Sequence, residues 1–110
     1  MATSIEEHLL ELRLELPPVP PVRGLYAPAR ISGNLLYLSE SGGAASEPGE
    51  GLGRLGRELT IEQGRKAAKM AVLKSLSIAN SFLGRLESVR CVVKLLGFVS
   101  STENFHWKSR

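Results

Sequence analysis

The stretch of sequence that decides the fold runs from Thr60 to Gly84 and reads TIEQGRKAAKMAVLKSLSIANSFLG. Thr60 can cap a helix N-terminus, and Gln63 stands three residues later, as a capping box requires. Gly84 is placed to end the helix in a left-handed conformation. Between these ends, small and apolar residues recur at helical spacing and predict one continuous buried stripe: Ile61, Gly64, Ala67, Ala68, Ala71, Val72, Ser75, Leu76, Ala79, Phe82 and Leu83. The sequence therefore predicts a single long helix packed against a sheet.

The N-terminal segment predicts a short helix followed by an extended spacer. Ser4 can cap a helix that runs to about Leu14, with Glu7 at the capping-box position. The prolines from Pro17 to Pro21 predict a polyproline segment. Residues 18–23 read PVPPVR, the PxxP-plus-basic pattern that some SH3 domains bind, although a stiff spacer is the more frequent role of such a run.

A β-hairpin is predicted between this spacer and the long helix. Tyr26 to Ile31 forms one strand, residues 32–34 the turn, and Leu35 to Ser39 the second strand. Residues 40–56 are rich in glycine, serine, alanine and glutamate and predict a loop.

After the helix, Val89 to Ser100 predicts a long strand. Its odd positions are apolar and can lie under the helix. Its even positions include Leu96 and Phe98, which need another cover, and a partner subunit is the expected one. The predicted fold class is α+β: hairpin, long helix and long strand, with one helix packed on a mixed sheet and a short N-terminal helix.

Length, charge and cysteine content narrow the class of protein. A chain of 110 residues fits one domain, and its apolar runs are too short for a membrane span. Residues 1–50 carry three arginines and seven glutamates, net −4, whereas residues 51–110 carry eleven basic and four acidic residues, net +7. Cys91 is the only cysteine, and the first residues resemble no secretory or transit peptide, so a cytoplasmic protein is expected, with an organelle left open.

No motif by itself indicates a reaction. Residues 51–56 read GLGRLG, formally GxGxxG, but they adjoin neither a strand nor a helix N-terminus, so a dinucleotide site is rejected. His8 and His106 stand at opposite ends and predict surface residues, and Cys91 predicts a small buried thiol. The chain offers no metal-ligand cluster, and the basic residues of the helix lack aromatic neighbours for base stacking, so nucleic acid is the least favoured partner.

Five segments, taken in order, resemble the RidA/YjgF family of reactive-intermediate deaminases, also described as endoribonuclease-like. They are LELPP at 14–18, GLYAPA at 24–29, GNLLYLS at 33–39, GRLGRELT at 53–60 and LESVRCVVKLLGFV at 86–99. The resemblance covers most of the chain up to Phe105. It divides the chain into an N-terminal helix with its proline-rich spacer, residues 1–23, and a RidA-like domain, residues 24–110.

The resemblance implies a chorismate-mutase-like fold assembled as a homotrimer. It also implies interface pockets that hydrolyse small 2-imino and enamino acids to 2-oxo acids and ammonium, without metal or cofactor. Tyr26 and Ser39 match residues near the family's pocket and are the candidate substrate-binding residues, while no catalytic residue is assigned. In the family glycine and glutamine follow that serine; here Glu40 and Ser41 follow, and a carboxylate at Glu40 would repel an anionic substrate.

The family's carboxylate-binding arginine and acid/base glutamate come from strands that follow a second helix, and the sequence ends at Arg110 before either. The tail from His106 to Arg110 departs from the family, as a splice product or a mispredicted gene end would. The expectation is a C-terminally shortened RidA-like chain that lacks the second helix and closing strands and has impaired or lost deaminase activity. The alternatives are a non-catalytic subunit that joins full-length relatives and, less favoured, an RNA-binding or RNA-cleaving protein.

Overall fold

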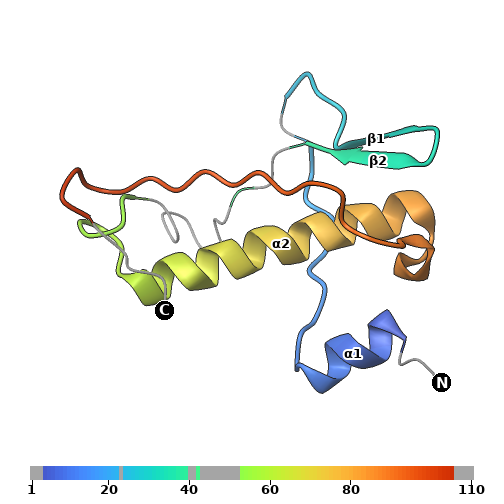
Figure 1. The fold of residues 1–110 in the computed structure, drawn as a ribbon, viewed down its shortest axis with the longest axis horizontal. Coiled ribbons are helices and arrows are strands. Elements are labelled where there is room, and N and C mark those ends of the chain that lie inside the picture. Colours follow the sequence, from blue (N-terminus) through green and yellow to red (C-terminus); the bar gives the residue numbers. More distant parts are fainter. Residues whose placement is uncertain (1–3, 23, 40–41, 43–52, 106–110) are drawn as a thin grey trace. The chain divides into compact units, whose positions relative to one another are not determined.

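The computed structural model describes residues 4–22, 24–39, 42 and 53–105. Its elements, in chain order, are helix α1 (Ile5–Glu11), strands β1 (Ala29–Ser32) and β2 (Leu35–Leu38), helix α2 (Ile61–Leu83) and the 3₁₀ turn η1 (Leu86–Ser88) (Figure 1). The two strands pair antiparallel. The chain is therefore α+β, with a hairpin followed by a long helix, as the sequence predicts. No helix in the described ranges is long and apolar enough to cross a membrane.

Helix α2 begins and ends where its capping residues predict. The Gln63 backbone N–H donates to Thr60 Oγ1 at 3.2 Å, and the Thr60 N–H donates to Gln63 Oε1 at 2.8 Å, which completes the capping box. At the other end Gly84 has φ +80°, and its N–H donates to the Asn80 carbonyl. Because glycine adopts this left-handed conformation without a Cβ penalty, it terminates the helix.

The buried side of α2 differs from the predicted stripe. Ile61, Gly64 and Ala67 are half-buried as expected, but Val72 and Phe82 are exposed. The buried residues of the C-terminal half are Leu73, Ser77, Ile78 and Ala79. The neighbours of this half explain the change, because Ser77 Oγ donates to the Pro17 carbonyl at 2.6 Å and so turns its side of the helix toward the polyproline segment.

The chain divides into two compact units, Met1–Ser41 with Val72–Val93, and Gly42–Ala71 with Lys94–Arg110. Within the described chain, the buried residues all belong to the first unit. Leu86, in η1, is the most enclosed at 2% exposure, and Leu73, Ile78, Ala79 and Ala29 complete the apolar core.

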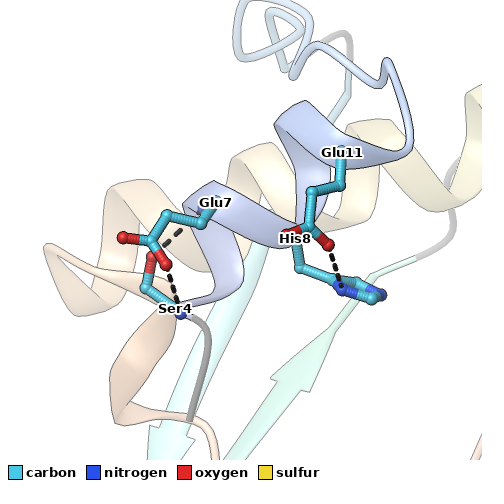
Figure 2. Close-up of polar contacts among 4 residues, drawn as sticks. All are labelled: Ser4, Glu7, His8 and Glu11. Carbon is cyan, nitrogen blue, oxygen red and sulfur yellow. Dashed lines mark hydrogen bonds and ion pairs between the residues drawn. The ribbon is translucent and has the colours of Figure 1, made fainter. Parts of the chain in front are cut away.

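Helix α1 is short and is held at both ends. Ser4 and Glu7 form a reciprocal capping box, with the Glu7 N–H 3.1 Å from Ser4 Oγ (Figure 2). At the C-terminus the Leu14 N–H donates to Leu9 and the Arg13 N–H to Leu10, which is the Schellman pattern. A long-range hydrogen bond from the Ile5 N–H to Glu87 Oε1, at 2.7 Å, ties α1 to η1.

The second unit is organised around Leu55. Its N–H donates to the Ser100 carbonyl, and its own carbonyl accepts from the Thr102 N–H. Its side chain lies over Gly64, where an added Cβ would come within 2.6 Å of Leu55 Cδ2. A glycine in the first turns of α2 therefore makes room for this leucine.

Two sequence expectations about strands are corrected. The first strand begins at Ala29 rather than Tyr26, because Pro28 has no N–H to pair. Residues 89–100 form no strand within the described chain, and their side chains are exposed at odd and even positions alike, with Val93 at 74% and Phe98 at 85%. A strand needs a neighbouring segment whose backbone groups pair with its own. Among the described residues, the pairing next to this segment is the isolated bridge between Leu55 and Ser101. The sheet is accordingly a two-stranded antiparallel one, and the expected mixed sheet is not formed within these residues.

Candidate functional site

The candidate site lies at the open end of the hairpin, where Ser39 is hydrogen-bonded to the residue that follows Tyr26. The Gly33–Asn34 turn sets a register in which Ala29 faces Leu38 and Ser32 faces Leu35. The pairing continues one step outward, because the Ser39 N–H donates to the Pro28 carbonyl at 3.0 Å. The Ser39 hydroxyl donates to the Ala27 carbonyl, the residue directly after Tyr26. These hydrogen bonds bring the two ends of residues 27–39 together, and we call this place the corner.

Glycines position both ends of this hairpin. Gly33 has φ +58° and Asn34 has no positive φ, which suits a turn with glycine at its first central position. At the other end, a Cβ on Gly24 would lie 3.1 Å from Cδ1 of the Tyr26 ring, so the ring is folded back over the Gly24 backbone. Tyr26 is nevertheless 51% exposed and can meet a ligand.

Among the described residues, the corner shows no group that would activate a nucleophile. The Ser39 proton is committed to the Ala27 carbonyl, so its oxygen is left to accept a hydrogen bond. Among the described residues, no hydrogen bond or ion pair brings an arginine or a carboxylate to Tyr26 or Ser39. Glu40 and Ser41, which follow Ser39, lie outside the described residues. The two candidate residues therefore offer a hydroxyl acceptor, on Ser39, and an exposed phenol that can donate, on Tyr26.

The other residues weighed for chemistry lie away from this corner. His8 is exposed on α1, with Nδ1 3.6 Å from Glu11 Oε2 (Figure 2). His106 is outside the described residues. Cys91 is exposed, which corrects the expectation of a buried thiol, because the segment that carries it is covered on neither face. Across the described ranges, no three His, Cys, Asp or Glu side chains gather as metal ligands would.

The described part of the glycine-rich run, residues 53–56, is a folded loop in which the amides of residues 54–56 are already used. Residues 51 and 52 lie outside the described chain, and Gly53 and Gly56 have φ values of +133° and +87°. The N–H groups of residues 54–57 and 59 all donate within the protein, to Glu58, Ser100, Leu59 and Arg54. A phosphate cradle needs free amides, and the amides of residues 54–56 are not free.

Glu58 anchors this loop, a role that the sequence analysis missed. Its Oε2 accepts from the Arg54 N–H at 2.8 Å, and its Oε1 lies 3.2 Å from Arg57 Nε. The hydrogen bond from the Arg54 backbone, then that from its own N–H and the nearby arginine charges, lower the Glu58 pKa from its ordinary value of 4.5. The available signal was a glutamate two residues before the Thr60 cap and two residues after Gly56, a glycine that allows an unusual turn.

The chain is similar to several known proteins. No protein-family model matches it. It is 32% identical over 101 residues to Protein TCP17 of Trypanosoma cruzi, a match that covers 92% of this chain and 63% of that protein.

Two solved structures share the fold. The protein Atu1372 of Agrobacterium tumefaciens, of unknown function, superposes with a TM-score of 0.79 at 35% identity, over 94% of this chain and 63% of its own. A candidate endoribonuclease from Shewanella oneidensis MR-1 superposes with a TM-score of 0.70 at 28% identity, over 77% of this chain and 56% of its own. The chain thus spans less than two thirds of the length of each of these relatives. The likenesses support the fold superfamily of the RidA/YjgF proteins.

Proposed function

We propose that this chain is a RidA-like polypeptide whose hairpin corner binds reactive 2-imino and enamino acids on the way to 2-oxo acids and ammonium. The supporting observation is the corner itself. Ser39, one of the two residues that the family resemblance implies, is hydrogen-bonded to Ala27 and Pro28, which follow the other implied residue, Tyr26, in the chain.

The chemistry needs little from the protein beyond orientation and proton transfer. Water adds to the imine carbon, the nitrogen takes up a proton, and the C–N bond breaks to release ammonium and the 2-oxo acid. Ser39 Oγ can accept from the substrate nitrogen, and the Tyr26 phenol can donate to a substrate oxygen. The corner holds no cation for the substrate carboxylate among the described residues, so the isolated chain is a weak catalyst or none.

The test is hydrolysis of 2-aminoacrylate generated in the cuvette by a serine dehydratase, with release of the 2-oxo acid as the readout. We expect the chain alone to be about 100-fold slower than a full-length relative, because an unclamped substrate loses its orientation. A rate equal to that of the relative would contradict the proposed weakness.

Matched variants test whether the corner is the binding site. Tyr26→Phe and Ser39→Ala should each weaken binding of a stable 2-oxo acid product in a calorimetric titration. Tyr37→Phe removes the other tyrosine hydroxyl of the hairpin, which is 57% exposed, and should bind like the original chain. Equal losses in all three variants would overturn the assignment to the corner.

A non-catalytic subunit is the second candidate function, and one observation favours it. Residues 89–99 expose a row of apolar side chains, among them Leu95 at 81% and Phe98 at 85%, on a backbone with no ladder partner in the described chain. Such a segment favours pairing with another chain. The proposed partner is a second copy, in a trimer, or a full-length relative.

Light scattering after gel filtration tests the partner. We expect a mass of three times the 11.9 kDa chain, or co-elution with a co-expressed full-length relative. Leu96→Lys should abolish either species, whereas Leu25→Lys changes a fully exposed leucine outside the segment and should not. A monomer that elutes apart from the relative would contradict this candidate.

RNA binding or cleavage is the least supported function. It rests on the description of the Shewanella oneidensis neighbour and on exposed Arg65, Lys66 and Lys69 of α2. A single-stranded RNA affinity that falls steeply with salt would support it, since released counterions drive such binding.

A further inference from the structure

We propose that residues 18–22, Pro-Val-Pro-Pro-Val, are a docking peptide for a protein domain of the SH3 type, which binds polyproline helices in an aromatic-lined groove. The proposal does not depend on the deaminase function. Arg23, which follows in the sequence, lies outside the described residues, and the site consists of residues 18–22 alone.

The sequence sets the backbone of this segment before any packing. Pro17, Pro18, Pro20 and Pro21 have φ fixed near −65° by their rings. A residue that precedes a proline is driven to extended conformations, which constrains Val19 as well. The structure places residues 17–22 in neither helix nor strand. A polyproline II helix is what these restrictions allow, and it repeats every three residues.

The burial of the segment follows that repeat of three. Pro17 and Pro20 are half-buried, whereas Pro18, Val19, Pro21 and Val22 are exposed. The Pro17 carbonyl is fixed by Ser77 Oγ at 2.6 Å, and Ser77 is itself 4% exposed. One ridge of the polyproline helix is therefore held against the protein, and the ridge formed by Pro18 and Pro21 faces outward.

The outward ridge contains the two prolines of the PxxP pattern. Between the described residues, no hydrogen bond uses a carbonyl of residues 18–22, so these oxygens can accept from tryptophan or tyrosine donors of a groove. A spacer requires only stiffness. In the structure the segment is fixed on one side and exposed on the side that such grooves recognise. Because the segment is already ordered, less conformational entropy is lost on binding.

The experiment titrates the full chain into a purified, isotope-labelled SH3 domain of known PxxP specificity, observed by NMR. We expect saturable shifts confined to the aromatic groove. The variant P18A/P21A should lower the association constant at least about tenfold, equivalent to 1.4 kcal/mol. The matched variant P17A/P20A also removes two prolines three residues apart, but from the half-buried ridge, and should lower it less than about threefold.

Thermal unfolding of both variants checks that each remains folded. Absence of shifts with the original chain, equal losses in the two variants, or binding that survives P18A/P21A would each overturn the proposal. A WW domain titrated in parallel distinguishes the groove type, and binding to that domain alone would overturn the SH3 assignment.

Discussion

Arg13 adopts the left-handed conformation that glycine usually supplies, with φ +57° at the end of α1. A side chain in this conformation costs roughly 1–2 kcal/mol, because Cβ approaches the following carbonyl oxygen. The Schellman hydrogen bonds of Arg13 and Leu14 hold it there. Helix α1 therefore ends on a strained residue.

Arg13→Gly should relieve this strain and stabilise the end of α1 by about 1 kcal/mol. The Leu14 amide should then exchange about fivefold more slowly with deuterium. Glu15→Gly, at an exposed position with no positive φ, controls for the general effect of glycine and should not slow exchange. Equal slowing in both variants would contradict the strain at Arg13.

The depressed pKa of Glu58 predicts that the stability of its loop, residues 53–59, depends on pH. Its folded pKa is depressed, so its stabilisation is present above the ordinary value of 4.5 and is lost as the pH falls through the folded pKa. Carboxyl-carbon NMR should place the Glu58 pKa below 4.5, and the Arg54 amide should lose protection over the same range. Glu58→Gln should remove this pH dependence, and a titration at or above 4.5 would contradict the anchoring role.

At the scale of elements, local capping decides where each helix begins. Helix α2 depends on the Thr60 and Gln63 box, and α1 on the Ser4 and Glu7 box. Both boxes could be predicted from sequence because they involve residues only three positions apart.

Thr60→Ala should lower the free energy of unfolding by about 1 kcal/mol, because it leaves the Gln63 N–H without its acceptor. Thr60→Ser retains the hydroxyl and should cost much less. Urea denaturation of both variants measures the difference, and equal destabilisation would indicate that the Thr60 methyl group, rather than the cap, is responsible.

Glu87 fixes α1 to η1 through the Ile5 amide at 2.7 Å. Glu87→Ala should weaken this attachment by about 1 kcal/mol, a reduced value for a charged hydrogen bond that is only part-buried. Limited proteolysis between residues 4 and 14 should become faster, while the exposed control Glu103→Ala should leave the rate unchanged. An unchanged rate in Glu87→Ala would show that apolar packing holds α1.

At the scale of the whole molecule, the limits of sequence reasoning follow the range of the contacts. Both helices, the hairpin and the α+β class could be predicted from patterns within about twenty residues. The state of residues 89–100 could not, because alternation predicts an extended chain but not its neighbours. The candidate corner was predicted only in part: its two residues came from a family resemblance, and the hydrogen bonds of Ser39 to Ala27 and Pro28 emerged from the hairpin register.

The exposed Cys91 is also the only thiol in the chain. A single chemical tag can therefore be attached near the N-terminal end of the exposed segment, residues 89–99, without mutating the protein. The rate at which a disulfide reagent reacts with this thiol would measure how far the segment is covered. The rate would be high for a single chain and lower when another polypeptide covers the segment.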